Sequence, residues 1–172
     1  MKNKTPPIAE GAVITRNIPD SQEGIDFEVR RMIKYVQHYS GDTRIIQAAR
    51  HAVENCPSHD VLCESETLLA RLMPVTRFVQ DPTRKEFIVT PVKQLKEINT
   101  RGIVSGDCDE LATLLATFLS AIGHRPRFIF GAEGKGWQHV WVQDRGVHLD
   151  LAERLPFGKF LSFAEYGAAA IW

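Results

Sequence analysis

Three residues in the second half of the chain have the types and the spacing that catalysis by a thiol requires. Cys108 stands in the run GDCDEL, His139 in WQHVW and Asp150 in HLDL. Nucleophilic catalysis of this kind needs a thiolate, a base that forms it and a third group that orients the base. We therefore take Cys108 as the candidate nucleophile, His139 as the base and Asp150 as the orienting carboxylate, which predicts cysteine-dependent acyl transfer.

The candidate nucleophile opens the clearest helix of the sequence, which we predict from Asp107 to Gly123. Its apolar positions recur at helical spacing: Leu111, Leu114, Leu115, Phe118, Leu119 and Ile122. Asp107 followed three residues later by Glu110 predicts a capping box, and Gly123 is a natural C-terminal stop. The backbone N–H groups of a first helical turn favour a thiolate at Cys108, whereas the neighbouring carboxylates oppose it. His139 must therefore supply much of the stabilisation.

Strands after this helix must bring the base to the carboxylate. We predict three strands, over residues 127–131, 137–143 and 147–151. A hairpin turning at Asp144 and Arg145, with Gln143 paired to Gly146, would set His139 directly opposite Asp150, and a bulge at Gly146 would offset that pairing by one residue. Cross-strand neighbours at this spacing can hydrogen-bond, which fixes the tautomer of the imidazole.

Strand alternation also predicts which side of this hairpin is buried. The apolar face, predicted to lie in the core, consists of Val140, Val142, Leu149 and Leu151. The polar face is then predicted to line a cleft at Cys108. His148 lies on this face with Asp150 and is a rival to His139 for the role of base.

The rest of the chain reads as helices in front of this small sheet. We predict helices over about 25–40, from residue 42 or 43 toward 56, over 61–79 with a break at Pro74, and a helical turn from Pro91. The aromatic tail after Pro156 is predicted to pack as a helix or a cover. Residues 1–24 read as an extended arm and residues 25–172 as one domain, which together define an α+β fold.

Composition restricts the classes of function. The 172 residues are 44% hydrophobic and 24% charged, and 21 basic residues balance 21 acidic ones. This balance gives no support to a nucleic-acid or membrane partner, and no apolar run approaches the roughly 18 residues of a membrane span. Three cysteines in a chain without an export signal argue against a disulfide framework. We therefore predict a reduced, cytoplasmic protein.

A second set of potential ligands is the cluster His51, Cys56, His59 and Cys63. Two thiolates and two imidazoles can form a tetrahedral zinc site. Their spacing, however, matches no paired zinc-ligand pattern. We predict no metal and no cofactor.

Several runs together resemble the transglutaminase-like superfamily. They are FVQDP, EFIVTP, GDCDELATLL, HVW and LD, and the likeness covers about residues 60–152. The resemblance implies a papain-like α+β fold with the nucleophile on a helix packed against a sheet. It implies Cys108 as nucleophile, His139 as general base and acid and Asp150 as orienting carboxylate, with a thioester intermediate. Small bacterial and phage members are the most similar in length.

The resemblance also guides the search for groups that bind the oxyanion or the substrate. The backbone N–H of Cys108 is one candidate donor to the oxyanion. The side-chain candidates for oxyanion or substrate binding are Gln80, Trp137 and Trp141.

Three functions remain open at this stage. The first is a peptidase or amidase acting on a protein or peptide substrate, in which water accepts the acyl group. The second is a transglutaminase, in which an amine replaces water. The third is a non-catalytic virion or assembly protein of a phage that uses the same fold, which would place the chain in the virion with assembly partners.

Overall fold

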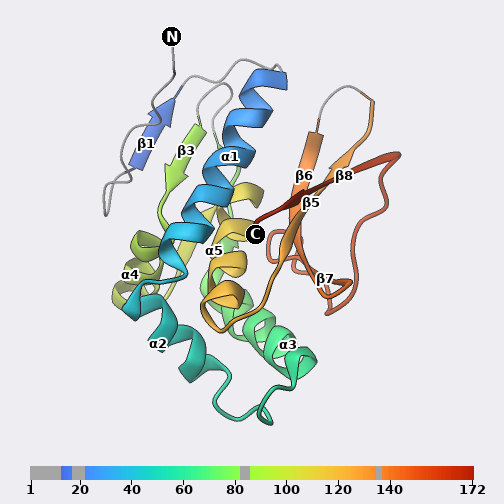
Figure 1. Ribbon diagram of the computed structural model, residues 1–172. Helices are drawn as coiled ribbons and strands as arrows, with labels where there is room; N and C mark the ends of the chain where they lie inside the picture. The colour runs from blue at the N-terminus through green and yellow to red at the C-terminus, as the bar shows by residue number, and fades with distance from the viewer. Residues whose placement is uncertain (1–12, 17–21, 82–85, 135–136) are drawn as a thin grey trace.

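The computed structural model describes residues 13–16, 22–81, 86–134 and 137–172, and it has the expected α+β architecture (Figure 1). The helices are α1 (Gln22–Tyr39), α2 (Thr43–Ala52), α3 (Val61–Leu72), the 3-10 turn η1 (Met73–Val75), α4 (Pro91–Arg101) and α5 (Cys108–Ala121). The strands are β1 (Val13–Arg16), β2 (Thr76–Phe78), β3 (Glu86–Val89), β4 (Val104–Gly106), β5 (Arg127–Ala132), β6 (Trp137–Asp144), β7 (Val147–Leu149) and β8 (Glu165–Ala170).

Helix α5 is the centre of the core and carries the candidate nucleophile at its first residue. It contacts the other four α-helices, the short strands β2 and β4, and strand β6 of the sheet. Its predicted apolar stripe is confirmed, since Leu111, Leu114, Leu115 and Leu119 are each 0% exposed. Burial of one such side chain contributes about 1.5–3 kcal/mol, so the helix that holds Cys108 is firmly anchored.

Side-chain caps fix where the helices begin. Asp42, Asp60, Thr90 and Asp107 accept hydrogen bonds from first-turn N–H groups of α2, α3, α4 and α5. The predicted capping box at α5 is only half present. Glu110 Oε1 accepts a hydrogen bond from the backbone N–H of Val89, at 3.1 Å, and so ties α5 to β3.

The main sheet has four antiparallel strands in the order β7-β6-β5-β8, with one more strand than predicted. Strands β6 and β7 are joined by a two-residue turn at Arg145 (φ 47°) and Gly146 (φ 85°). Positive φ at both positions is typical of a type I′ turn, which suits the twist of the flanking strands.

The predicted register of this hairpin is wrong by two residues. Gln143 pairs with His148 rather than with Gly146, so His139 lies diagonal to Asp150 rather than directly opposite. A shift of two residues leaves each side chain on its predicted face. The predicted apolar face is accordingly buried: Val140, Val142, Leu149 and Leu151 are at most 5% exposed.

Two other predicted elements take different forms. The helix predicted over 61–79 ends at Leu72. The 3-10 turn η1, which contains Pro74, follows it and leads into β2, which pairs in parallel with β4. The tail ends in β8, an added strand beside β5, rather than in a helix. Residues 156–164 before it cross the sheet without regular structure; we call this segment the aromatic strap.

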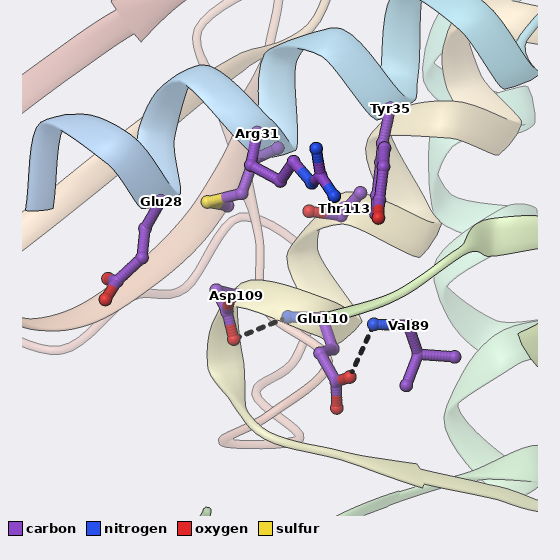
Figure 2. A pocket seen from close by; sticks show the side chains of 8 residues that line it. Glu28, Arg31, Tyr35, Val89, Asp109, Glu110 and Thr113 are labelled. Atoms are coloured by element: carbon purple, nitrogen blue, oxygen red, sulfur yellow. Dashed lines mark hydrogen bonds between the residues drawn. The ribbon is translucent and has the colours of Figure 1, made fainter. Parts of the chain in front are cut away.

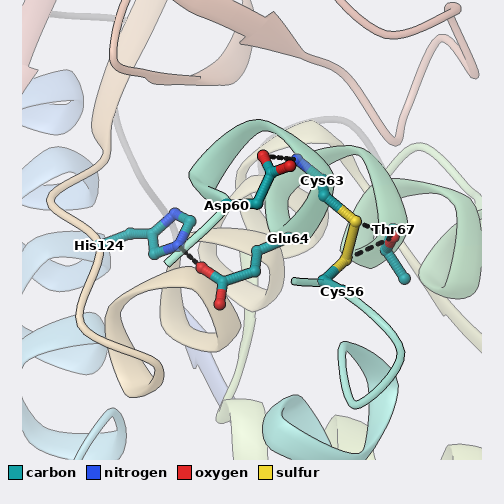
Figure 3. The surroundings of a disulfide bond; sticks show 6 residues. All are labelled: Cys56, Asp60, Cys63, Glu64, Thr67 and His124. Carbon is teal, nitrogen blue, oxygen red and sulfur yellow. Dashed lines mark hydrogen bonds and ion pairs between the residues drawn. A yellow bond between two sulfur atoms is a disulfide. The ribbon is translucent and has the colours of Figure 1, made fainter. Parts of the chain in front are cut away.

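The prediction against disulfides is wrong for one pair. Cys56 and Cys63 form a disulfide that joins the segment after α2 to the first turn of α3 (Figure 3). Both sulfurs are therefore unavailable as zinc ligands, and the described residues contain no group of three His, Cys, Asp or Glu side chains placed to hold a metal ion.

The predicted arm over residues 1–24 is described only in part. Strand β1 pairs antiparallel with β3, and α1 begins at Gln22. Residues 1–12 and 17–21 lie outside the described ranges. Among the helices that the structure describes, none is long and apolar enough to cross a membrane.

Candidate active site

The short strand β4 precedes Cys108, the candidate nucleophile. The parallel pairing of Phe78 with Gly106 and the hydrogen bond from Val79 N to Gly106 O (2.9 Å) hold the end of β4. Two residues later Cys108 begins α5 and is partly buried. Since the other two cysteines are joined in a disulfide, Cys108 is the one free thiol of the chain.

The predicted base and the predicted carboxylate are in direct contact. His139 Nε2 lies 2.6 Å from Asp150 Oδ2, and the two residues are 8% and 2% exposed. The other carboxylate oxygen, Asp150 Oδ1, accepts a hydrogen bond from the backbone N–H of Glu153 at 3.1 Å. This second contact fixes the plane of the carboxylate, so the imidazole is oriented by a group that is itself held in place.

The imidazole also faces the candidate nucleophile, because Cys108 and His139 line the same cleft. With Nε2 occupied by Asp150, Nδ1 is the ring nitrogen left to exchange a proton with the Cys108 side chain. Burial lowers the pKa of His139 and is the largest single influence. The hydrogen bonds to Asp150 and Cys108 and the negative charges of both outweigh it and raise the pKa to about 10. His139 is therefore largely protonated near neutral pH.

Acidic neighbours of Cys108 oppose a thiolate less than their number suggests. Burial, a hydrogen bond with Asp107 and nearby negative charge raise the pKa of Asp109 well above its usual range. Burial and the charges of Asp107 and Asp81 likewise raise the pKa of Glu110 to about 8. Glu110 therefore stays largely protonated at neutral pH and contributes little repulsion, and the raised pKa of Asp109 acts in the same direction.

A small cavity behind the nucleophile contains a buried cation. Figure 2 shows the Arg31 guanidinium between α1 and α5, in the cavity that Asp109 and Glu110 also line. Arg31 is 2% exposed, and its Cζ lies 5.1 Å from the centroid of the Tyr35 ring. One positive charge is thus buried between α1 and α5, in a cavity that two carboxyl groups of the first turn of α5 also line.

Aromatic rings enclose the other side of the base. Trp141 stacks on His139 with ring centroids 5.6 Å apart. Phe163 of the aromatic strap also stacks on His139, with ring centroids 6.1 Å apart. A Cβ at Gly131 would overlap the Phe163 ring, so this glycine permits the strap to lie close to the sheet. The rings keep water from the His139–Asp150 pair, which strengthens their interaction.

The rival base His148 has a different role. Its Nδ1 accepts a hydrogen bond from Trp141 Nε1 at 2.7 Å, and its ring stacks on Phe160 with centroids 4.0 Å apart. Burial and the positive charge of Arg127 lower its pKa. His148 therefore supports Trp141, and the structure brings His139, not His148, to the nucleophile.

A cleft of about 180 Å³ opens over the nucleophile. It is lined by Cys108 and His139 on one side and by the α1 residues Ile25, Glu28 and Val29 on the other. Burial, followed by the charge of Asp107, raises the pKa of Glu28 to about 7. Sequence reasoning missed this wall, because the helical pattern shows that α1 has a buried face but not what that face meets.

The three side-chain candidates for oxyanion or substrate binding have different positions. Trp137 lines the cleft, whereas Trp141 is 1% exposed and lies behind His139. Gln80 is exposed and is not among the described residues that line the cleft. It follows β2, which pairs in parallel with β4, the strand that leads to Cys108. Gln80 and Cys108 therefore both follow the same end of this two-stranded sheet.

A second buried histidine offers a comparison within the same chain. His124 lies between two carboxylates, with Nδ1 2.7 Å from Asp144 Oδ2 and Nε2 2.8 Å from Glu64 Oε2. Figure 3 shows the contact with Glu64. Ser65 Oγ donates to the same Asp144 oxygen at 2.9 Å. Burial opposes the charged imidazole, but these hydrogen bonds and charges raise its pKa. The cluster joins α3 to the end of β6 and contains no cysteine.

Comparisons with protein-family models, with curated proteins and with solved structures give no match for this chain. The assignment of a function therefore depends on the residues and the geometry of the site.

Proposed function

We propose that this protein is a cysteine-dependent acyl-transfer enzyme of the transglutaminase-like superfamily, acting as a peptidase or amidase on protein or peptide substrates. One observation carries the proposal: His139 lines one cleft with the free thiol of Cys108, at the start of α5, and is in direct contact with the buried and oriented carboxylate of Asp150. A nucleophile, a base and an orienting group placed together in this order is the arrangement that thiol catalysis requires.

The reactive form of the site has a thiolate at Cys108 and a proton on His139 Nδ1, and in the first half of the reaction the thiolate sulfur attacks the amide carbonyl carbon. The carbonyl oxygen becomes an oxyanion, which the N–H groups at the start of α5 are suited to stabilise. His139 then gives the proton to the amine nitrogen as the C–N bond breaks. The products of this half are a thioester on Cys108 and a free amine, while Asp150 holds the imidazole in orientation.

In the second half, water enters the cleft and attacks the thioester carbon. Neutral His139 accepts one proton of this water at Nδ1 as the new C–O bond forms. The C–S bond then breaks, releasing a carboxylic acid and restoring the thiolate beside a protonated His139. Since the same nitrogen serves as acid and then as base, one oriented imidazole suffices for both halves.

The decisive experiment measures the rate of Cys108 alkylation by iodoacetamide against pH in the parent protein and in His139→Ala. Fast reaction at pH 5–6 that is lost in His139→Ala supports the thiolate–imidazolium pair, because an isolated thiol has a pKa of about 8.5. His124→Ala is the matched control, since it removes another buried, carboxylate-bound histidine. Equal rates in all three proteins would refute the proposal.

A second candidate, transfer of the acyl group to an amine, is favoured by one observation. Glu28 lines the cleft with Cys108, and its pKa is raised to about 7. Its carboxylate can take a proton from an entering ammonium group, and the resulting amine can attack the thioester carbon. The C–N bond forms as the C–S bond breaks, and neutral His139 accepts the proton that the nitrogen loses, which leaves an amide product and the Cys108 thiolate. Mass analysis of the products with and without added methylamine distinguishes this reaction from hydrolysis.

The non-catalytic alternative, a virion or assembly role, makes the opposite prediction for one variant. If the chain acts only as a scaffold, Cys108→Ala will retain full biological function with an unchanged fold. Loss of function in that variant, with the same unfolding midpoint as the parent, excludes the scaffold role. Oligomeric state measured by light scattering provides the accompanying control.

A further inference from the structure

A groove continues the active-site cleft along the outside of the sheet. It has a volume of about 270 Å³ and lies between α1 and strand β8. The groove and the cleft share four apolar side chains: Ile25, Val29, Phe130 and Trp137. A molecule whose reacting carbonyl lies at Cys108 can therefore extend directly into the groove.

The strand that forms one wall of this groove has an unpaired edge. Strand β8 is the last in the order β7-β6-β5-β8, and in the described part of the chain it pairs with β5 alone (Figure 1). Three consecutive residues, Gly167, Ala168 and Ala169, line the groove. Alternate side chains of a strand point to opposite faces, so contact with all three means that the groove reaches the edge of β8 and not only one face.

Small side chains keep this edge accessible. A Cβ at Gly167 would lie 2.7 Å from Trp137 Cη2, so glycine at this position lets the indole lie flat against β8. The indole then forms an apolar floor shared by the cleft and the groove. The alanines that follow add no bulk that would block a chain running beside the strand.

We propose that the free edge of β8 binds the peptide substrate as an additional strand, with an apolar side chain of the substrate in the groove. This inference rests on the proposed function and specifies its substrate: a peptide in extended conformation with an apolar residue close to the scissile bond. Unpaired N–H and C=O groups of an edge strand bind extended peptides through main-chain hydrogen bonds, and adjacent pockets select the side chains.

The first test uses a reactive peptide, acetyl-Ala-Leu-Gly chloromethyl ketone, and follows the rate of alkylation of Cys108. We expect replacement of the leucine by aspartate, or N-methylation of its amide, to lower that rate about tenfold, the cost of one lost pocket contact or hydrogen bond. Chloroacetamide, which has no peptide, is the control reagent. Equal rates for the three peptides, with normal reactivity toward chloroacetamide, overturn the β8 proposal and leave the proposed function intact.

The second test does not depend on the chemistry of the thiol. In Cys108→Ala, millimolar acetyl-Ala-Leu-Gly-Ala amide should slow hydrogen exchange of the backbone amides in residues 165–170, and the N-methylated peptide should not. Unchanged exchange refutes the proposal, even if Cys108 proves inert to chloroacetamide and the proposed function fails. Protection that rises with protein concentration, together with a dimer in light scattering, also refutes it, because a second copy of the chain then occupies the edge.

A pair of variants tests the edge from the side of the protein. Neighbouring residues of a strand direct their N–H groups to opposite edges, so one of Ala168→Pro and Ala169→Pro removes an N–H from the free edge and the other removes one from the pairing with β5. The variant that keeps the unfolding midpoint of the parent should lose about tenfold in alkylation by the peptide ketone and nothing with chloroacetamide. Equal rates of both reactions in that variant contradict the inference.

Discussion

Replacing Asp150 by asparagine tests the electrostatic basis of the candidate site while preserving its shape. The pKa of His139 is raised from 6.5 to about 10, which at about 1.4 kcal/mol per pKa unit is a preference of about 5 kcal/mol for the charged imidazole. An opposite charge in direct contact accounts for about 1–3 units of such a shift. Asp150→Asn removes the charge and keeps an oxygen that can accept from the imidazole, so we expect the pKa of His139 to fall by about 2 units.

This fall has a direct consequence for the nucleophile. An imidazole whose pKa falls from about 10 to about 8 still carries its proton at pH 6, so we expect the rate of alkylation of Cys108 at pH 6 to change little in Asp150→Asn. The charged imidazole that favours the thiolate is instead lost near pH 8 in the variant and near pH 10 in the parent, and the two rates should separate in that range. Titration of the His139 ring by NMR, together with the alkylation rate between pH 4 and 10, measures both quantities.

The other buried carboxylate–histidine pair supplies the control. Asp144→Asn removes the carboxylate from His124 and should leave the pKa of His139 and the alkylation rate unchanged, since the two pairs share no residue. An unchanged His139 pKa in Asp150→Asn would refute the reasoning, as would an equal loss of reactivity in the two variants.

Three further outcomes are expected. Gly131→Ala forces the Phe163 ring off the sheet and should lower the free energy of unfolding by about 1–3 kcal/mol, measured with urea; an unchanged value would contradict the close packing of the aromatic strap. Reduction of the Cys56–Cys63 disulfide frees the loop it closes and should lower the free energy of unfolding by about 2 kcal/mol. The reductant should have no effect on the Cys56→Ser/Cys63→Ser double variant, and an equal loss there would point to a different cause. The pKa of His124 is raised in the folded state, so its contribution to stability is complete below pH 6.5 and is lost as the pH rises through the folded value. The difference in unfolding free energy between parent and His124→Gln should therefore shrink as the pH rises above 6.5, and a constant difference would count against the buried ion pairs.

Local patterns were sufficient to predict the parts that position the thiol and the imidazole. The leucine repeat and Asp107 predict α5 and its start, because both signals are contained in one helix. Alternation along the hairpin of β6 and β7 predicts that His139 and Asp150 lie on one face. This prediction holds although the predicted register is wrong, because an error of two residues leaves each side chain on the same face. The contact between the two side chains could therefore be predicted even though their exact cross-strand pairing could not.

Features that depend on distant segments could not be predicted in the same way. Strands β2 and β4 have three residues each, too few for a periodic signal, and their parallel pairing spans α4. Strand β8 is rich in glycine and alanine, which have low strand propensity, so its pairing with β5 overrides its local preference. The position of Glu28 in the wall of the cleft depends on how α1 packs against the rest of the protein, and the local sequence of α1 does not contain that information.

The placement of the site along the chain has a consequence for how the protein folds. His139 and Asp150 are eleven residues apart and are joined by a tight hairpin, a structure that forms within about 1–10 μs. Cys108 reaches them only after α5 has packed against the sheet, a contact of longer range and hence a slower one. The histidine–carboxylate pair can thus assemble early, while the sulfur gains its histidine neighbour late. In a nascent or partly unfolded chain the Cys108 thiol consequently has no imidazole beside it, and any reactivity that depends on His139 requires the completed core.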